Sequence, residues 1–377
     1  MLIHLDDSLR SCFDAFTEAE WDSLNNLAIA AREGRHFILT TRGLAEALAS
    51  QSNIGPRERA LYRMIKERYS TIAVMTDQVR VWARVSHDIS PERVVLGKNE
   101  EIRLPLSFFA TTAAIQPTIL LAENLDDCYL IYEMARALAR SIGLGSVKTT
   151  FDNRPGGGST THQVAEDLLN LMNRLLIAVV DSDKETPGGA IGNTARDTRK
   201  VFHDLSPEIG QLVIVRGRDL ENLLPDAFYR DNFIHHVDHG QSAAFITALE
   251  SAGCGLARLH IDIEQGLTLN VLLREAGVPN DFENVWGKVV IAVSGQQLPA
   301  SQGCVACALA GYCANPAACG CVLTRGNSMD LLSIGAEAWR RNGREFWRTL
   351  PHCIESAFME VARAAFDWGC ASSLQPT

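Results

Sequence analysis

The stretch LLIAVVDSDK, Leu175 to Lys184, runs six apolar residues directly into two aspartates separated by one serine. An apolar run of this length, bounded by polar residues, is typical of a strand buried in the middle of a parallel sheet. In an open sheet of this kind, ligands bind in the crevice at the carboxyl ends of the strands. The sequence therefore predicts that Asp181 and Asp183 lie at such an edge, although aspartates also follow strands because they favour turns.

Three further runs predict an α/β unit around this strand. They are TILLAEN at 118–124, SVKTTFD at 146–152 and QLVIVRGRD at 211–219, and helical patterns separate most of them. Alternating strands and helices predict a mostly parallel sheet with helices on both faces. We expect this α/β catalytic domain to span residues 116–298.

The two flanking parts of the chain have a different pattern. From Ser8 to about Arg93, apolar residues recur every three or four positions, so we expect a helical N-terminal unit over residues 1–115. After Gln297 come a cysteine cluster and then two helical stretches. Residues 299–377 are therefore expected to form a Cys-rich helical C-terminal unit.

Composition limits the classes of function. The chain has 377 residues, which is enough for two or three packed units, and a formal net charge of −10 at pH 7. This charge argues against a uniformly basic nucleic-acid binder, so any contact with nucleic acid is expected to be local. No run approaches the length that spans a bilayer, and the first residues do not resemble a signal peptide. We expect a cytoplasmic protein without a membrane association.

A second predicted strand also ends on an acid. In ILLAENLDD, Glu123 follows the apolar residues and Asp127 lies four positions later, one turn into a predicted helix. RPGGGSTTHQ at 154–163 has three consecutive glycines, which allow the backbone to approach a ligand or a neighbouring loop closely. Carboxylates gathered at one edge repel each other unless a cation lies between them, and Mg²⁺ prefers such oxygen ligands.

The order strand, Glu, helix, strand, glycine-rich turn, helix, strand, Asp-x-Asp resembles the Toprim domain of topoisomerases, primases and overcoming-lysogenization-defect type nucleases. Glu123 and Asp127 match its first motif, whereas Asn124 stands where glycine is usual. The resemblance implies that Glu123, Asp181 and Asp183 hold Mg²⁺ or Mn²⁺. It implies that Asp127 is a further ligand or orients the attacking water.

The segments RGRDLENLLPDAFY at 216–229 and LHIDIEQGLTLNVLL at 259–273 look like parts of the Toprim-like nucleases that stand beside ATPases in bacterial antiphage defence. This resemblance covers roughly residues 117–274 and points to Glu221 as a further catalytic residue. A surface acid at the start of a helix is the alternative interpretation of Glu221. Lys184 and Arg154 are the candidates for positive charge near the phosphates, and either is equally explained as a solvated surface charge.

These features favour a metal-dependent nuclease that hydrolyses DNA or RNA and acts as a defence effector gated by a partner. The sequence has no GxxxxGK[ST] motif, so an ATPase would be a separate protein. Two alternatives stay open. VVDSDKET superficially looks like the haloacid-dehalogenase motif, in which Asp181 would be a nucleophile. In the second alternative, the chain is a non-catalytic, zinc-containing module that binds proteins or nucleic acid.

The segment GCVACALAGYCANPAACGC at 303–321 is the second strong signal. A C-x2-C pair followed by more cysteines predicts a zinc site, because two thiolates two residues apart can share one tetrahedral ion. The expected ligands are Cys304, Cys307 and Cys313, with either Cys319 or Cys321 as the fourth. The spacing also resembles an auxiliary iron–sulfur segment of some radical enzymes, so an Fe–S cluster is the alternative.

A third cluster gives a weaker signal. FIHHVDHGQ at 233–241 contains His235, His236, Asp238 and His239, which in principle could bind a metal or carry a proton. Such a run is more typical of a polar helix end or a loop.

Overall fold

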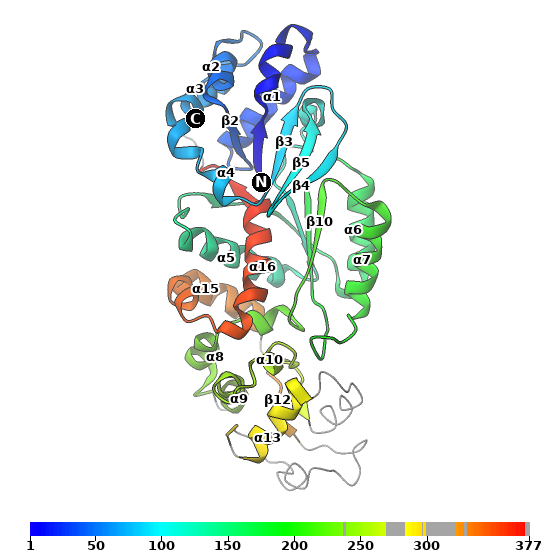
Figure 1. Cartoon of the computed structure of the whole chain (residues 1–377), viewed down its shortest axis with the longest axis vertical. Coiled ribbons are helices and arrows are strands. Elements are labelled where there is room, and N and C mark those ends of the chain that lie inside the picture. Colours follow the sequence, from blue (N-terminus) through cyan, green and yellow to red (C-terminus); the bar gives the residue numbers. More distant parts are fainter. Residues whose placement is uncertain (237–238, 269–282, 296, 299–321, 328–329, 374–377) are drawn as a thin grey trace. The chain divides into compact units, whose positions relative to one another are not determined.

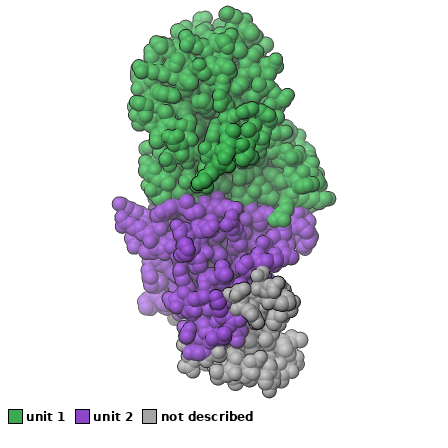
Figure 2. All heavy atoms as spheres, in the orientation of Figure 1, with its two compact units in different colours: residues 1–179, 198–213, 361–377 green, residues 180–197, 214–360 purple. Residues whose placement is uncertain are grey.

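The computed structural model describes residues 1–236, 239–268, 283–295, 297–298, 322–327 and 330–373 (Figure 1). The chain forms two compact units (Figure 2). Unit 1 comprises residues 1–179, 198–213 and 361–377, and unit 2 comprises residues 180–197 and 214–360. Each unit draws on more than one of the three parts expected from the sequence, and the role of those parts as domains stays a prediction.

Unit 1 contains a five-stranded sheet in the order β2-β1-β3-β5-β4. Its strands are β1 (Leu2–Leu5), β2 (Phe37–Thr40), β3 (Val81–Ser86), β4 (Glu92–Leu96) and β5 (Asn99–Pro105). The β1–β2, β1–β3 and β3–β5 pairs are parallel, and β4 pairs antiparallel with β5. The helices of this part are α1 (Glu18–Arg32), α2 (Arg42–Ser50), α3 (Pro56–Ile72) and α4 (Met75–Gln78).

The prediction of a purely helical N-terminal unit is therefore wrong, although α1, α2 and α3 lie where helices were expected. The missed strand β3 buries Val81, Ala83 and Val85 and leaves the residues between them half-buried. This alternation has the period of two that marks a strand with one buried face. β3 follows α3 and α4 closely in the sequence, so its apolar residues are read as a continuation of the helical pattern.

The second sheet has the order β10-β9-β6-β8. Its strands are β6 (Ile119–Ala122), β8 (Asp152–Pro155), β9 (Leu176–Val180) and β10 (Gly210–Ile214). β6 is parallel to both β8 and β9. Hydrogen bonds join the starts of β9 and β10, from Leu176 N to Ile209 O, and their ends, from Val215 N to Val180 O, so this pair is parallel as well.

Helices α5 (Leu125–Ser141), α6 (Thr161–Asn170) and α7 (Asn193–Leu205) connect the strands of this sheet in turn. The strands need such crossovers because they are parallel. Residues of β6 and β9 pack with those of α6 in one apolar core: Ile119, Leu121, Ala165, Leu169, Leu176 and Ala178. The expected α/β class, with parallel-rich sheets and flanking helices, is confirmed.

Unit 2 is mostly helical. It contains α8 (Asp226–Phe233), α9 (Gly240–Ser251), α10 (Gly255–Arg258), α13 (Lys288–Ser294) and α15 (Leu331–Arg348). The strands β11 (Gly266–Thr268) and β12 (Val322–Arg325) form an antiparallel pair. α16 (His352–Gly369) follows α15, so both expected C-terminal helices are present, and no described helix is long and apolar enough to cross a membrane.

Candidate functional site

The strand order of the second sheet reverses at β6, which has β8 on one side and β9 on the other. Ligand sites of open α/β sheets form at such a switch point, outside the carboxyl ends of the strands. Glu123 is the residue directly after β6, and Asp181 is the residue directly after β9. Both predicted acids therefore follow the two strands that define the switch point.

The glycine-rich turn holds the backbone at Glu123. The N–H groups of Gly157 and Gly158 donate to the Glu123 carbonyl at 2.9 and 3.4 Å, and the Gly156 N–H donates to Ala122 O at 2.7 Å. Gly157 and Gly158 have φ angles of 75° and 63°, which glycine adopts without the strain of a side chain. Of the two roles expected for these glycines, the structure shows the approach to a neighbouring loop.

Asp127 is engaged in capping α5. Its Oδ2 accepts from the Asn124 N–H at 2.9 Å, and its own N–H donates to Asn124 Oδ1 at 3.0 Å. Burial raises the pKa of Asp127 to about 6, against the hydrogen bonds from Asn124. This reciprocal pair also explains Asn124, because asparagine is a strong N-cap residue and the glycine usual in the Toprim motif lacks a capping side chain.

The serine between the two aspartates anchors their loop in unit 2. Ser182 is buried, and its Oγ donates to Gly217 O at 2.6 Å. The N–H groups of Ser182 and Asp183 both donate to the carbonyl of Arg218, at 3.0 and 2.9 Å. Asp183 adopts a φ of 55°, a left-handed conformation that aspartate tolerates better than most residues. The loop thus holds Ser182 inside and leaves Asp183 exposed.

The guanidinium of Arg218 forms ion pairs with acidic side chains from three segments of unit 2. It pairs with Asp262 at 2.9 Å, with Asp219 at 3.4 Å and with Glu185 at 3.8 Å. The Arg218 N–H also donates to Leu259 O at 2.6 Å. The loop after β9 and the segments at 216–229 and 259–273 therefore meet at Arg218.

Asp219 is an acid of this cluster with a raised pKa. Burial raises its pKa to about 7, the charge of Arg218 opposes this, and the charges of Asp262, Asp183 and Glu264 raise it further. A carboxyl group with a pKa near 7 can gain or lose a proton at neutral pH. The sequence analysis assigned no role to Asp219, Asp262 or Arg218, because their relation depends on contacts between distant segments.

The remaining predicted residues have local partners. Lys184 Nζ donates to Pro187 O at 3.3 Å, within its own loop. Glu221 is buried in a 3-10 turn (Leu220–Leu223), so its interpretation as a surface acid is wrong. Arg154 is half exposed and pairs with Asp152 at 3.0 Å in unit 1.

The described residues do not form a ready metal site. Among them, no group of three or more His, Cys, Asp or Glu side chains is placed to hold a metal ion. Glu123 belongs to unit 1, whereas Asp181 and Asp183 belong to unit 2, so neither unit by itself assembles the expected Mg²⁺ ligands. The expected zinc ligands Cys304, Cys307, Cys313, Cys319 and Cys321, together with Asp238 of the histidine-rich run, lie outside the described residues.

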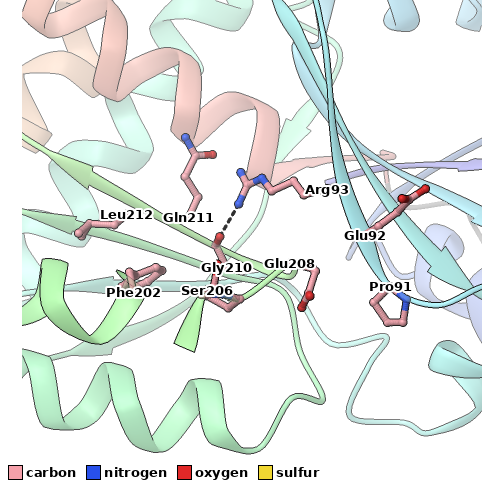
Figure 3. A pocket seen from close by; sticks show the side chains of 10 residues that line it. Pro91, Glu92, Arg93, Phe202, Ser206, Glu208, Gly210, Gln211 and Leu212 are labelled. Atoms are coloured by element: carbon pink, nitrogen blue, oxygen red, sulfur yellow. Dashed lines mark hydrogen bonds between the residues drawn. The ribbon is translucent and has the colours of Figure 1, made fainter. Parts of the chain in front are cut away.

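A cavity of about 530 Å³ opens in unit 1, and none of the predicted site residues is among the residues that line it (Figure 3). Arg93 lies at its wall, where its NH1 donates to Gly210 O at 2.6 Å and its guanidinium lies 5.9 Å from the centre of the Trp368 ring. The lining residues are Pro91, Glu92, Arg93, Phe202, Ser206, Pro207, Glu208, Gly210, Gln211 and Leu212.

Comparison with known proteins gives no match: no family model, no curated protein and no solved structure is similar to this chain.

Proposed function

We propose that this chain is a nuclease that hydrolyses phosphodiester bonds of DNA or RNA and requires a divalent metal ion. The observation that carries the proposal is the position of Glu123 directly after β6 and of Asp181 directly after β9, at the switch point of a parallel sheet. Acids at such strand ends are suited to phosphoryl chemistry. The resemblance to Toprim nucleases supports the same reading.

The chain's own residues account for part of the chemistry. Asp183 is the exposed acid of its loop, held in place by the hydrogen bonds to Arg218. Asp219, with a pKa near 7, can accept the proton that an attacking water loses. Arg218 balances the negative charge of this cluster and so keeps its acids close together.

A metal ion bound with the substrate would polarise the scissile phosphate and lower the pKa of a bound water. Among the described residues, no group of three or more His, Cys, Asp or Glu side chains is placed to hold this ion. The metal requirement, the cytoplasmic location and a separate ATPase as gating partner are parts of the proposal. The last of these rests on the resemblance to ATPase-associated nucleases.

A non-catalytic role is the second candidate, and the pairing of Arg218 favours it. An arginine that neutralises Asp262, Asp219 and Glu185 supplies a structural reason for these acids without any ligand. The chain would then be a module that binds proteins or nucleic acid.

Cleavage of a substrate panel tests the proposal. Plasmid DNA, single-stranded DNA and total tRNA are incubated with the wild type in Mg²⁺, in Mn²⁺ and in EDTA. The same reactions use Asp181→Ala, Glu123→Ala and, as a control, Asp204→Ala, which changes an exposed acid on α7. Metal-dependent cutting that only the first two substitutions abolish supports the nuclease. Equal cutting by all variants would remove the assigned site.

A further inference from the structure

Helix α5 in unit 1 has one side that is exposed or partly exposed along its length. Its buried face packs with apolar side chains: Cys128, Leu130, Ile131, Met134, Ala135 and Leu138. Another line of residues is spaced by three or four positions, so its members lie on one side of the helix. We call this line the α5 stripe; it consists of Leu125, Tyr129, Tyr132, Arg136 and Arg140.

The stripe exposes rings and positive charge. Leu125 and Tyr129 are 42% and 45% exposed, Tyr132 and Arg136 are partly exposed, and Arg140 is exposed. The exposed faces of soluble helices are usually polar, so two tyrosines in this line call for an explanation. Packing of α5 does not explain the two tyrosines, because the buried residues of the helix lie on its opposite face.

The arginines complement the rings. The Arg136 guanidinium lies 5.5 Å from the centre of the Tyr132 ring, and its NH1 donates to the two carboxylate oxygens of Glu133 at 2.9 and 3.1 Å. The carboxylate of Glu133 is buried, whereas Arg136 is 33% exposed. The stripe thus presents two rings beside two guanidinium groups, of which that of Arg136 is paired with Glu133 and that of Arg140 is exposed.

We propose that the α5 stripe binds a single strand of nucleic acid, with bases stacked on Tyr129 and Tyr132 and phosphates near Arg136 and Arg140. This rests on the proposed nuclease function. Aromatic rings beside arginines are how proteins hold single strands without reading their sequence. A duplex does not fit this surface, because its bases are already stacked and paired and are not available to the rings.

The spacing and position of the stripe agree with such a strand. Three helical residues separate the tyrosines by about 4.5 Å along the axis, somewhat more than the roughly 3.4 Å between stacked bases of one strand. Neighbouring bases of a partly unstacked strand can therefore meet neighbouring rings. α5 begins two residues after Glu123, so the bound strand would lead toward the edge of the sheet where Glu123 lies.

Fluorescence anisotropy with the full chain tests the inference. The probes are labelled oligothymidylate, oligouridylate and a duplex of oligothymidylate with oligoadenylate, in EDTA so that no cleavage occurs. We expect the wild type to prefer the single strands, and Tyr129→Ala with Tyr132→Ala to weaken their binding by about tenfold or more. Tyr129→Phe with Tyr132→Phe keeps the rings and should keep the affinity.

Further variants separate stacking from charge and from folding. Tyr69→Ala on α3 is the control for loss of a partly exposed tyrosine elsewhere in unit 1. Arg136→Gln with Arg140→Gln should weaken binding to both kinds of single strand and reduce its dependence on salt. Far-ultraviolet circular dichroism of each variant establishes that α5 is still formed.

Two results would overturn the inference: wild-type affinity in the double alanine variant, or equal affinity of the wild type for the duplex. Neither result bears on the nuclease itself, which the cleavage panel tests separately. Suppose that the wild type cuts no substrate and that the double alanine variant loses binding to single strands. The inference about the α5 stripe would then stand, and the proposed nuclease activity would be wrong.

Discussion

Asp183 places its carboxylate against the α-carbon of Gly192, so that a side chain at position 192 would occupy the space of that carboxylate. The Gly192 N–H donates to Ser182 O at 2.8 Å, which closes the loop after β9 on itself. The conformation of the Asp-x-Asp loop in unit 2 therefore depends on a residue nine positions further along the chain.

Gly192→Ala should move the Asp183 carboxylate without changing its charge. If Asp183 acts in cleavage, we expect a loss of about 10²-fold in rate, because displacement of a reacting group by about 1 Å has effects of this size. Gly189→Ala is the control in the same loop, since the three atoms nearest to a methyl group there belong to Thr186, at 3.1 to 3.4 Å, and not to Asp183. Initial rates and urea unfolding curves of both variants check this, and an unchanged rate in Gly192→Ala would exclude Asp183 from the chemistry.

Asp367 in α16 makes the stability of the chain depend on pH. This carboxyl group is 1% exposed, and burial raises its pKa to about 7 against the opposing charge of Arg363. The folded state therefore binds this proton more tightly than the unfolded state, in which the pKa of Asp367 is near 3.8. The free energy of unfolding should fall as the pH rises from about 4 to about 7, by at most about 1.4 kcal/mol per pH unit.

Asp367→Asn removes the titrating group and keeps its shape. Urea unfolding from about pH 5 to about pH 8 should show a smaller decline in the variant than in the wild type. Asp219 and Asp127, whose pKa values are also raised, leave part of the decline in place. Identical slopes for the two proteins would contradict this account of Asp367.

The capping pair of Asn124 and Asp127 predicts how two variants at position 124 rank in stability. Asn124→Ala should cost about 1 kcal/mol, because it removes the N-cap of α5, whereas Asn124→Gly should cost only a few tenths. The midpoint and slope of urea unfolding measure both values. If neither variant lowered the free energy of unfolding, the bond from the Asp127 N–H to the Asn124 side chain would not be what stabilises the start of α5.

The sequence predicted the second sheet better than the first. β6, β9 and β10 are apolar runs with clear ends, so their positions and their terminal acids could be inferred. The run SVKTTFD contains a short strand, β7 (Lys148–Thr149), which pairs with β13 (Cys370–Ala371) and not with the second sheet, whereas β8 begins at the last residue of the run, Asp152. β1 and β2 have four residues each, too few to show a period, and β3 continues a helical pattern.

In the candidate site, too, contacts between residues close in the sequence could be predicted, whereas contacts between distant segments could not. That Asp127 caps a helix is readable from the Asn-x-x-Asp pattern before an apolar helix. Its expected role as a metal ligand or as the residue that orients the attacking water stays a prediction. The pairing of Arg218 with Asp219, Asp262 and Glu185 was not readable, because it joins segments that are far apart in the sequence.

The cysteine segment predicts a bound metal that can be measured directly. We expect about one zinc ion per chain in the purified protein and its loss from the variant Cys304→Ser with Cys307→Ser. Cys12→Ser, a half-buried cysteine near the start of the chain, is the control. Elemental analysis distinguishes zinc from iron, and a visible absorption band would indicate the Fe–S alternative. Absence of both metals would contradict the predicted site.

Single-turnover cleavage by Asp181→Asn and Glu123→Gln, compared with the wild type, tests the central claim most directly. These substitutions remove one negative charge each and nearly preserve shape, and strand binding in EDTA shows whether the substrate is still held. The account predicts that both variants bind the substrate as the wild type does and fail to cut it in Mg²⁺ or Mn²⁺. Wild-type cutting by either variant would contradict the assignment of that acid at the switch point of the sheet.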